Sequence, residues 1–141
     1  MIYLLDNKKI RLNPYNMRKD KCLGTGTTAT AYLIDGKVFK LYNPFKEPEF
    51  LTKEKIELYK KIPTKRIMLA EASLLNKKRQ LRGCVSEYVE NLGKDNLSIQ
   101  PKSKIIEELK ILRKDFITLG KYDVIVHDAI LKNTIYNNGA Y

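Results

Sequence analysis

The sequence predicts an α+β protein, and three features of the chain carry that prediction. The stretch from Cys22 to Tyr42 combines a glycine turn with β-branched and aromatic runs, which is typical of a three-strand antiparallel meander. A helical segment and two further β-rich runs follow, so we expect a five-strand antiparallel sheet plus one helix over residues 1–90. A long amphipathic helix and a second strand-like stretch make up residues 91–141.

Length and composition narrow the class of protein. A chain of 141 residues with 43% hydrophobic and 30% charged residues is long enough for a hydrophobic core, and no run of it has the length and apolarity of a signal peptide or membrane helix. We therefore expect a cytoplasmic protein without a membrane partner. Cys22 and Cys84 match no metal spacing and are predicted to be buried, reduced thiols.

The formal net charge of +11 raises the question of nucleic-acid binding. The cations are scattered, however, and no aromatic residues alternate with the densest group, which extends from Lys77 to Arg82. A solvated basic surface explains this pattern better than a nucleic-acid interface.

Residues 1–12 alternate weakly around Asp6-Asn7 and predict a short edge hairpin. In the meander that follows, Gly24 and Gly26 allow a sharp turn and leave backbone N–H groups bare. Such groups can cradle an anion, and a phosphate fits this chemistry.

The rest of the meander predicts where its lysine points. A strand over residues 28–34, a hairpin turn at Asp35-Gly36 and a strand over residues 37–42 complete it. Because side chains alternate along a strand, Lys40 lies on one face with apolar neighbours. An ammonium group in such surroundings requires an anionic partner.

Between Pro48 and Pro63 the apolar residues recur at helical spacing, and Glu54 and Glu57 lie near one margin of that helix. Either carboxylate could face Lys40, and without that lysine both would form exposed pairs with neighbouring lysines. Residues 67–75 and 80–89 then predict two strands joined around Asn76, which complete the sheet.

Ser103 is a suitable cap for a helix that Gly120 ends. Its apolar residues follow one face and require a partner: Ile105, Leu109, Leu112, Phe116 and Leu119. After it, an apolar strand-like run enters His127-Asp128, and Asn133 opens another β run.

These patterns resemble the protein kinase superfamily. Gly24 and Gly26 match its glycine-rich loop, Lys40 matches its Val-Ala-Ile-Lys strand, and Asp128 and Asn133 match its Asp-x-x-x-x-Asn catalytic loop. The resemblance covers nearly the whole chain in the family's order.

The chain also departs from the kinase pattern. Ala29 replaces the third glycine and Ala31 the valine of the loop, while Val126 and His127 replace the usual histidine and arginine before the aspartate. A histidine near that aspartate is also similar to aminoglycoside and choline kinases, so the subfamily is open.

The resemblance implies ATP and Mg²⁺ as cofactors. Lys40 would hold the α and β phosphates and Glu54 would position Lys40, with Glu57 as the alternative. Asp128 would accept the hydroxyl proton, and Asn133 would hold the metal ion.

For the adenine the resemblance implies an apolar sandwich and a hydrogen-bonding linker. Ser86 would occupy the gatekeeper position and leave an open back pocket. The residues implied for the base are Leu23, Ala31, Val38 and Ile135 around the ring, with the Glu87 carbonyl and the Val89 N–H at its edge.

Kinases also require an Asp-Phe-Gly aspartate, and the chain stops before it, inside a hairpin at Asn138-Gly139. We therefore expect a kinase-like N-terminal lobe followed by the first helix and catalytic-loop hairpin of an incomplete C-terminal lobe. The parent would transfer the γ-phosphoryl group of ATP to a hydroxyl of a protein or small molecule. The alternative is a noncatalytic pseudokinase that binds a nucleotide or a partner.

The apolar face of the second helix also predicts a partner. With most of its cover missing, that face would pack against a second copy in a homodimer, or against the missing C-terminal lobe.

Overall fold

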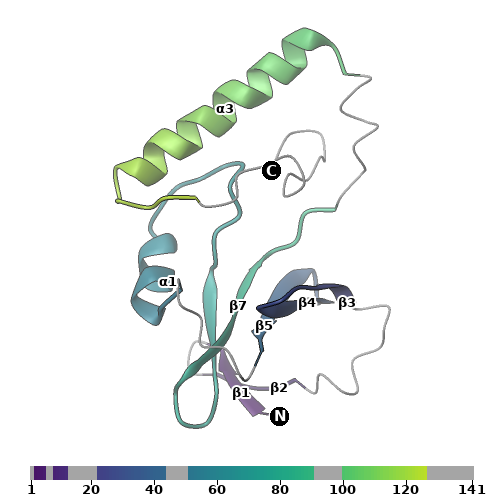
Figure 1. Ribbon diagram of the computed structural model, residues 1–141, viewed down its shortest axis with the longest axis vertical. Coiled ribbons are helices and arrows are strands. Elements are labelled where there is room, and N and C mark those ends of the chain that lie inside the picture. Colours follow the sequence, from purple (N-terminus) through teal and green to yellow (C-terminus); the bar gives the residue numbers. More distant parts are fainter. Residues whose placement is uncertain (1, 6–7, 13–21, 44–50, 91–99, 127–141) are drawn as a thin grey trace. The chain divides into compact units, whose positions relative to one another are not determined.

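The computed structural model describes residues 2–5, 8–12, 22–43, 51–90 and 100–126. Within this part of the chain there are seven strands and two helices, so the α+β class is confirmed (Figure 1). The strands are β1 (Ile2–Leu5), β2 (Lys8–Arg11), β3 (Cys22–Thr25), β4 (Ala29–Ile34), β5 (Lys37–Tyr42), β6 (Ala72–Leu75) and β7 (Leu81–Glu87), and the helices are α1 (Lys53–Tyr59) and α3 (Lys102–Gly120).

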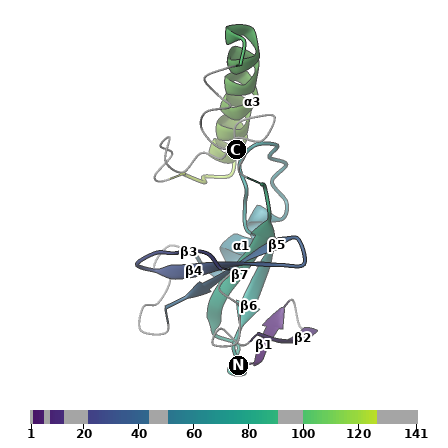
Figure 2. The same cartoon turned by 90° about the vertical axis from the view of Figure 1, so that its right-hand side faces the viewer.

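All strand pairs are antiparallel, and the order across the sheet is β2-β1-β6-β7-β5-β4-β3. The five strands expected from the sequence are contiguous in this order. The sheet is wider than predicted because the N-terminal hairpin pairs with β6 through Leu4 and Leu5. The β1–β2 and β3–β4 hairpins therefore form opposite edges (Figure 2).

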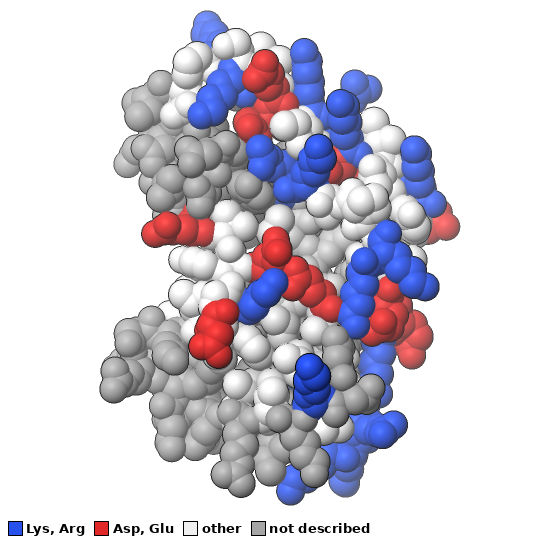
Figure 3. All heavy atoms as spheres, turned by 180° about the vertical axis from the view of Figure 1, so that it is seen from behind, with Lys and Arg blue, Asp and Glu red and all other residues white. Residues whose placement is uncertain are grey.

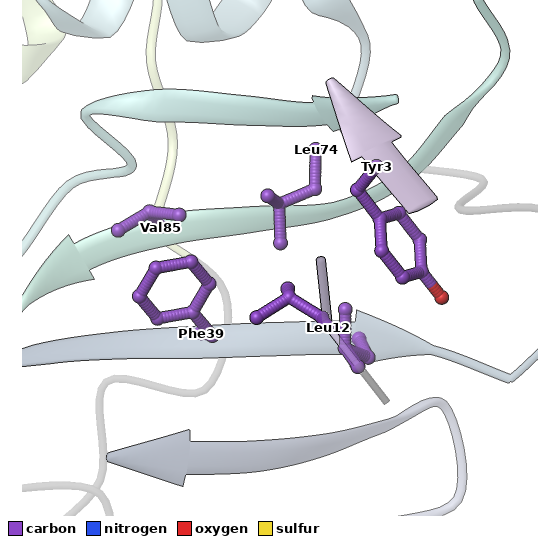
Figure 4. Packing of buried hydrophobic residues seen from close by; sticks show 6 residues of the cluster. Tyr3, Leu12, Phe39, Leu74 and Val85 are labelled. Carbon is purple, nitrogen blue, oxygen red and sulfur yellow. The ribbon is translucent and has the colours of Figure 1, made fainter. Parts of the chain in front are cut away.

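The main hydrophobic core lies on one face of the sheet. Along β5, Phe39 and Leu41 are buried while Lys40 between them is exposed, as strand alternation requires. Leu74 of β6 is completely buried in the same cluster, and such burial stabilises by about 1.5 to 3 kcal/mol per large side chain. The buried residues of this core are Tyr3, Leu12, Phe39, Leu41, Leu74 and Val85 (Figure 4).

Two predicted hairpin turns are confirmed. Asp35 and Gly36 both have positive φ, 48° and 73°, as the tightest hairpin turns need. At the β6–β7 turn the Asn76 side-chain oxygen accepts from the backbone amides of Lys78 and Gln80, each at 2.9 Å. Backbone conformation at the first turn and side-chain hydrogen bonds at the second thus stabilise the two turns locally.

Several predicted boundaries are wrong. Helix α1 begins at Lys53 rather than Pro48, because the Thr52 hydroxyl accepts from the Lys55 amide at 3.3 Å and caps the helix. Helix α3 begins before Ser103, with Pro101 at its cap position, where a proline removes no needed hydrogen bond. The sequence predicted a strand that leads into His127, but the described residues 121–126 form no strand.

Two burial predictions also differ from the structure. Cys84 is buried, but Cys22 is exposed because every residue of edge strand β3 is exposed. Along α3, Leu119 is completely buried, whereas Leu109 and Phe116 are 54% and 38% exposed. The predicted apolar face of α3 is therefore only partly covered.

The chain divides into two compact units. The first unit, Met1–Lys61 with Leu69–Tyr88, holds the sheet and α1, and the second unit, Ile62–Met68 with Val89–Tyr141, holds α3. The sequence indicated a division near residue 90, and the chain leaves the first unit between Tyr88 and Val89. It did not indicate that Ile62–Met68 belongs to the second unit.

Candidate functional site

The β3–β4 hairpin presents the glycine turn at an exposed edge of the first unit. Thr25 lies opposite Thr30, and the Gly26 amide donates to the Ala29 carbonyl at 2.8 Å. Every residue over 22–28 is exposed. The register shifts between Cys22 and Gly24, so Leu23, at 45% exposure, is the extra residue of a bulge.

Neither Gly24 nor Gly26 is required by the described backbone. Only Gly36 among the described glycines has a positive φ, so other residues could adopt the described conformations of Gly24 and Gly26 in this turn. Among the described residues, a Cβ at Gly24 would meet no atom within 4 Å, and one at Gly26 would meet only the Ala29 carbonyl oxygen, at 3.6 Å. The backbone at Gly24 therefore borders open space, where an anion can approach it closely, whereas the Gly26 N–H already donates to the Ala29 carbonyl.

Cross-strand register aligns Lys40 with this hairpin. Lys40 lies opposite Ala31, and Ala31 lies opposite Gly24, so all three positions share one face of the sheet. With neighbouring strands about 4.8 Å apart, the Lys40 backbone lies about 10 Å from that of Gly24, within reach of one bound polyphosphate. Lys40 is exposed and forms no ion pair with any described residue.

The same row continues from Lys40 to Cys84 and Ser73, which are buried. The Tyr42 hydroxyl donates to the Cys84 Sγ at 3.7 Å. Burial raises the pKa of the Cys84 thiol, against the opposing effects of the Tyr42 hydrogen bond and the Lys40 charge. Burial also raises the pKa of Tyr42. Both groups are therefore neutral at neutral pH, and Lys40 supplies the positive charge of the row.

The predicted glutamates have other partners. Glu54 is exposed in the first turn of α1, where hydrogen bonds from its own backbone amide and from the Thr52 hydroxyl lower the pKa of its carboxyl. Glu57 accepts from Lys60 at 2.8 Å. Among the described residues no ion pair joins either carboxylate to Lys40. The structure thus brings Lys40 to the glycine hairpin but does not pair it with Glu54.

The positions assigned to the adenine are partly described. Ala31 and Val38 are half-buried and share the face of Lys40. Ser86 lies opposite Val38, also on that face. Glu87 ends β7 and lies 3.6 Å from Lys37, while Val89 belongs to the second unit.

The catalytic loop predicted from the sequence lies outside the described residues. This applies to the proposed base Asp128, the metal ligand Asn133, the adenine contact Ile135 and His127.

Sequence reasoning missed a buried polar cluster in the second unit. Asp115 of α3 is 4% exposed, and its Oδ2 accepts from the amides of Lys65 at 2.8 Å, Ile67 at 3.1 Å and Arg66. The Arg66 guanidinium also binds both Glu108 oxygens, at 2.9 and 3.1 Å. The overlooked signal is a carboxylate on the buried side of α3, four residues before Leu119.

Comparisons with known proteins add no relative: no protein-family model matches the chain, and neither does any curated protein. In the described part of the chain, no group of histidine, cysteine and acidic side chains is arranged to hold a metal ion. No helix found there has both the length and the apolarity needed to cross a membrane.

Proposed function

We propose that this chain is the nucleotide-binding part of a kinase-like phosphotransferase. One observation carries the proposal: Lys40, a cation without an ion-pair partner among the described residues, shares a sheet face and a row with the bare backbone of Gly24. Backbone N–H groups and a nearby ammonium are the groups that bind the phosphates of ATP in kinases.

The order of the elements supports the same proposal. A three-strand meander, β3 to β5, is followed by helix α1 and then by the antiparallel pair β6–β7, which joins the meander through β5–β7 pairing. This is the sequence of elements that the kinase resemblance implies. Ala31 and Val38 would then form one wall of the adenine site, next to Lys40.

The roles of Mg²⁺ and of the residues in phosphoryl transfer are implied by the resemblance to the protein kinase superfamily. When bound, Mg²⁺ would neutralise phosphate charge, and Asn133 would hold it. Asp128 would take the proton of the acceptor hydroxyl. The contribution of the described residues is to bind the phosphates and orient them.

Replacing Lys40 by alanine tests the proposal. We expect Lys40→Ala to weaken Mg·ATP binding about tenfold or more, because it leaves phosphate charge uncompensated. Isothermal titration calorimetry measures both affinities. Lys37→Ala is the matched control, since Lys37 lies on the same strand and pairs with Glu71 at 2.8 Å. Equal losses in the two variants, or none in either, would remove Lys40 from the site.

Gly24→Ala separates binding from folding. The added methyl meets no described atom within 4 Å, so we expect the free energy of unfolding to change by less than about 0.5 kcal/mol. If phosphates approach that backbone, the same methyl should weaken Mg·ATP binding severalfold. Unchanged affinity in calorimetry, with unchanged stability, would show that no ligand contacts Gly24.

A noncatalytic nucleotide-binding module is the second candidate. It is favoured because Glu54 is exposed and forms no ion pair with Lys40. Without that ion pair nothing among the described residues holds Lys40 for catalysis. Radiolabelled ATP added to a longer parent protein that includes the C-terminal lobe distinguishes the two: release or transfer of the γ-phosphate supports the phosphotransferase, and tight binding without turnover supports the module.

A further inference from the structure

The acidic side chains of α3 are unevenly distributed around the helix. It carries three acids, and two of them point inward: Glu108 binds Arg66, and Asp115 accepts three backbone amides. Glu107 is the one left exposed. Its five cations have no such partners among the described residues: Lys102, Lys104, Lys110, Arg113 and Lys114. Cations consequently outnumber acids on the exposed surface of α3, where Figure 3 shows Lys and Arg in blue with a few acidic side chains in red between them.

The same outer surface is also apolar. Four large side chains on α3 are between 38% and 54% exposed: Ile106, Leu109, Phe116 and Ile117. With Leu112 and Arg113, three of them line a shallow hollow. At 100° per residue, Arg113 lies within this apolar group, and Glu107 lies about 120° from Arg113 but only about 60° from Lys110 around the helix. We call this surface the α3 face: Ile106, Leu109, Lys110, Arg113, Phe116 and Ile117.

We infer that the α3 face binds an acidic amphipathic helix of a partner protein. Apolar side chains in a shallow hollow suit a helix that lays its apolar stripe along them. Arg113 within the hollow and Lys110 beside it require carboxylates on that helix, next to its apolar stripe.

The sequence indicated two other occupants for this face, the missing C-terminal lobe and a second copy of the chain, and charge opposes the second copy. A second copy has the same formal net charge of +11 and would bring another Arg113 and Lys110 against the same cations. Like charges brought together at an interface oppose association. Glu108 and Asp115 lie on the opposite side of α3 and bind Arg66 and backbone amides, so they do not offset Arg113 and Lys110; Glu107 is the one exposed acid of the helix.

The test uses the full chain and two synthetic peptides. Each is an amphipathic helix of about 18 residues with a leucine stripe, flanked by glutamates in one peptide and by lysines in the other. Fluorescence anisotropy measures both affinities. We expect the glutamate peptide to bind about tenfold more tightly or better.

Two charge reversals locate the binding site. Arg113→Glu should weaken the glutamate peptide about tenfold and shift the preference toward the lysine peptide. Lys77→Glu makes the same change of charge at the exposed β6–β7 turn and should leave both affinities within about twofold. Circular dichroism should show both variants folded, since both positions are exposed.

Other outcomes would overturn the inference. Equal effects of the two reversals would show that only net charge matters. A dimer in sedimentation velocity that Arg113→Glu disrupts would identify a second copy as the occupant. Binding to phosphatidylserine vesicles that Arg113→Glu abolishes, without a preference between the peptides, would identify an anionic membrane surface instead.

Discussion

Replacing Gly83 by alanine should destabilise the first unit by about 3 kcal/mol, near the upper end of what overpacking costs. Gly83 lies in β7 opposite Leu41 of β5 and Leu74 of β6. A Cβ there would collide with the Lys40 carbonyl oxygen and lie 3.2 Å from the completely buried Leu74 side chain. A backbone atom cannot rotate away as a side chain can, so the strands themselves would have to separate.

Urea unfolding followed by far-ultraviolet circular dichroism measures this loss. Gly24→Ala is the matched control, because it adds the same methyl in the same sheet without a contact. Since the collision involves the Lys40 backbone, Gly83→Ala should also weaken Mg·ATP binding in the fraction that stays folded. A Gly83→Ala protein as stable as the wild type would mean that β5 and β7 lie farther apart at this point than the structure indicates.

The parts of the fold that the sequence predicted correctly depend on local chemistry. Asp35-Gly36 can adopt positive φ, and Asn76 can bind nearby amides. Both turns are therefore favoured by residues within the turn itself, whatever the strands pair with elsewhere. The face on which Lys40 lies follows from strand alternation alone. These predictions needed no knowledge of distant residues.

The errors arise where distant residues decide the structure. Residues 67–75 were predicted to form one strand, but the strand begins only at Ala72, and the Ile67 amide donates instead to Asp115, 48 residues away. The sequence did not indicate that position 83 requires glycine, because the requirement comes from the close approach of the β5 backbone. The predicted Lys40–Glu54 ion pair is absent among the described residues, and a local signal for this was overlooked. Thr52 caps α1, so Glu54 lies in the first turn of the helix, where its own backbone amide and the Thr52 hydroxyl bind its carboxylate.

The buried Asp115 should matter most for the stability of the second unit. Asp115→Ala would leave the partly buried amides of Lys65, Arg66 and Ile67 without their acceptor, and an unsatisfied amide costs up to about 1 to 3 kcal/mol when it is buried. Water entering the space left by the carboxylate would recover part of that cost. We therefore expect a loss of about 3 kcal/mol.

Asp115→Asn separates the hydrogen bonds from the charge. An asparagine oxygen can still accept from the same amides, but bonds to a neutral acceptor are weaker than bonds to a carboxylate. The loss should therefore be about half that of the alanine variant. Hydrogen exchange at residues 65–67 provides a local measurement, with protection falling from wild type to Asp115→Asn to Asp115→Ala. Unchanged protection in the alanine variant would show that these amides do not depend on Asp115.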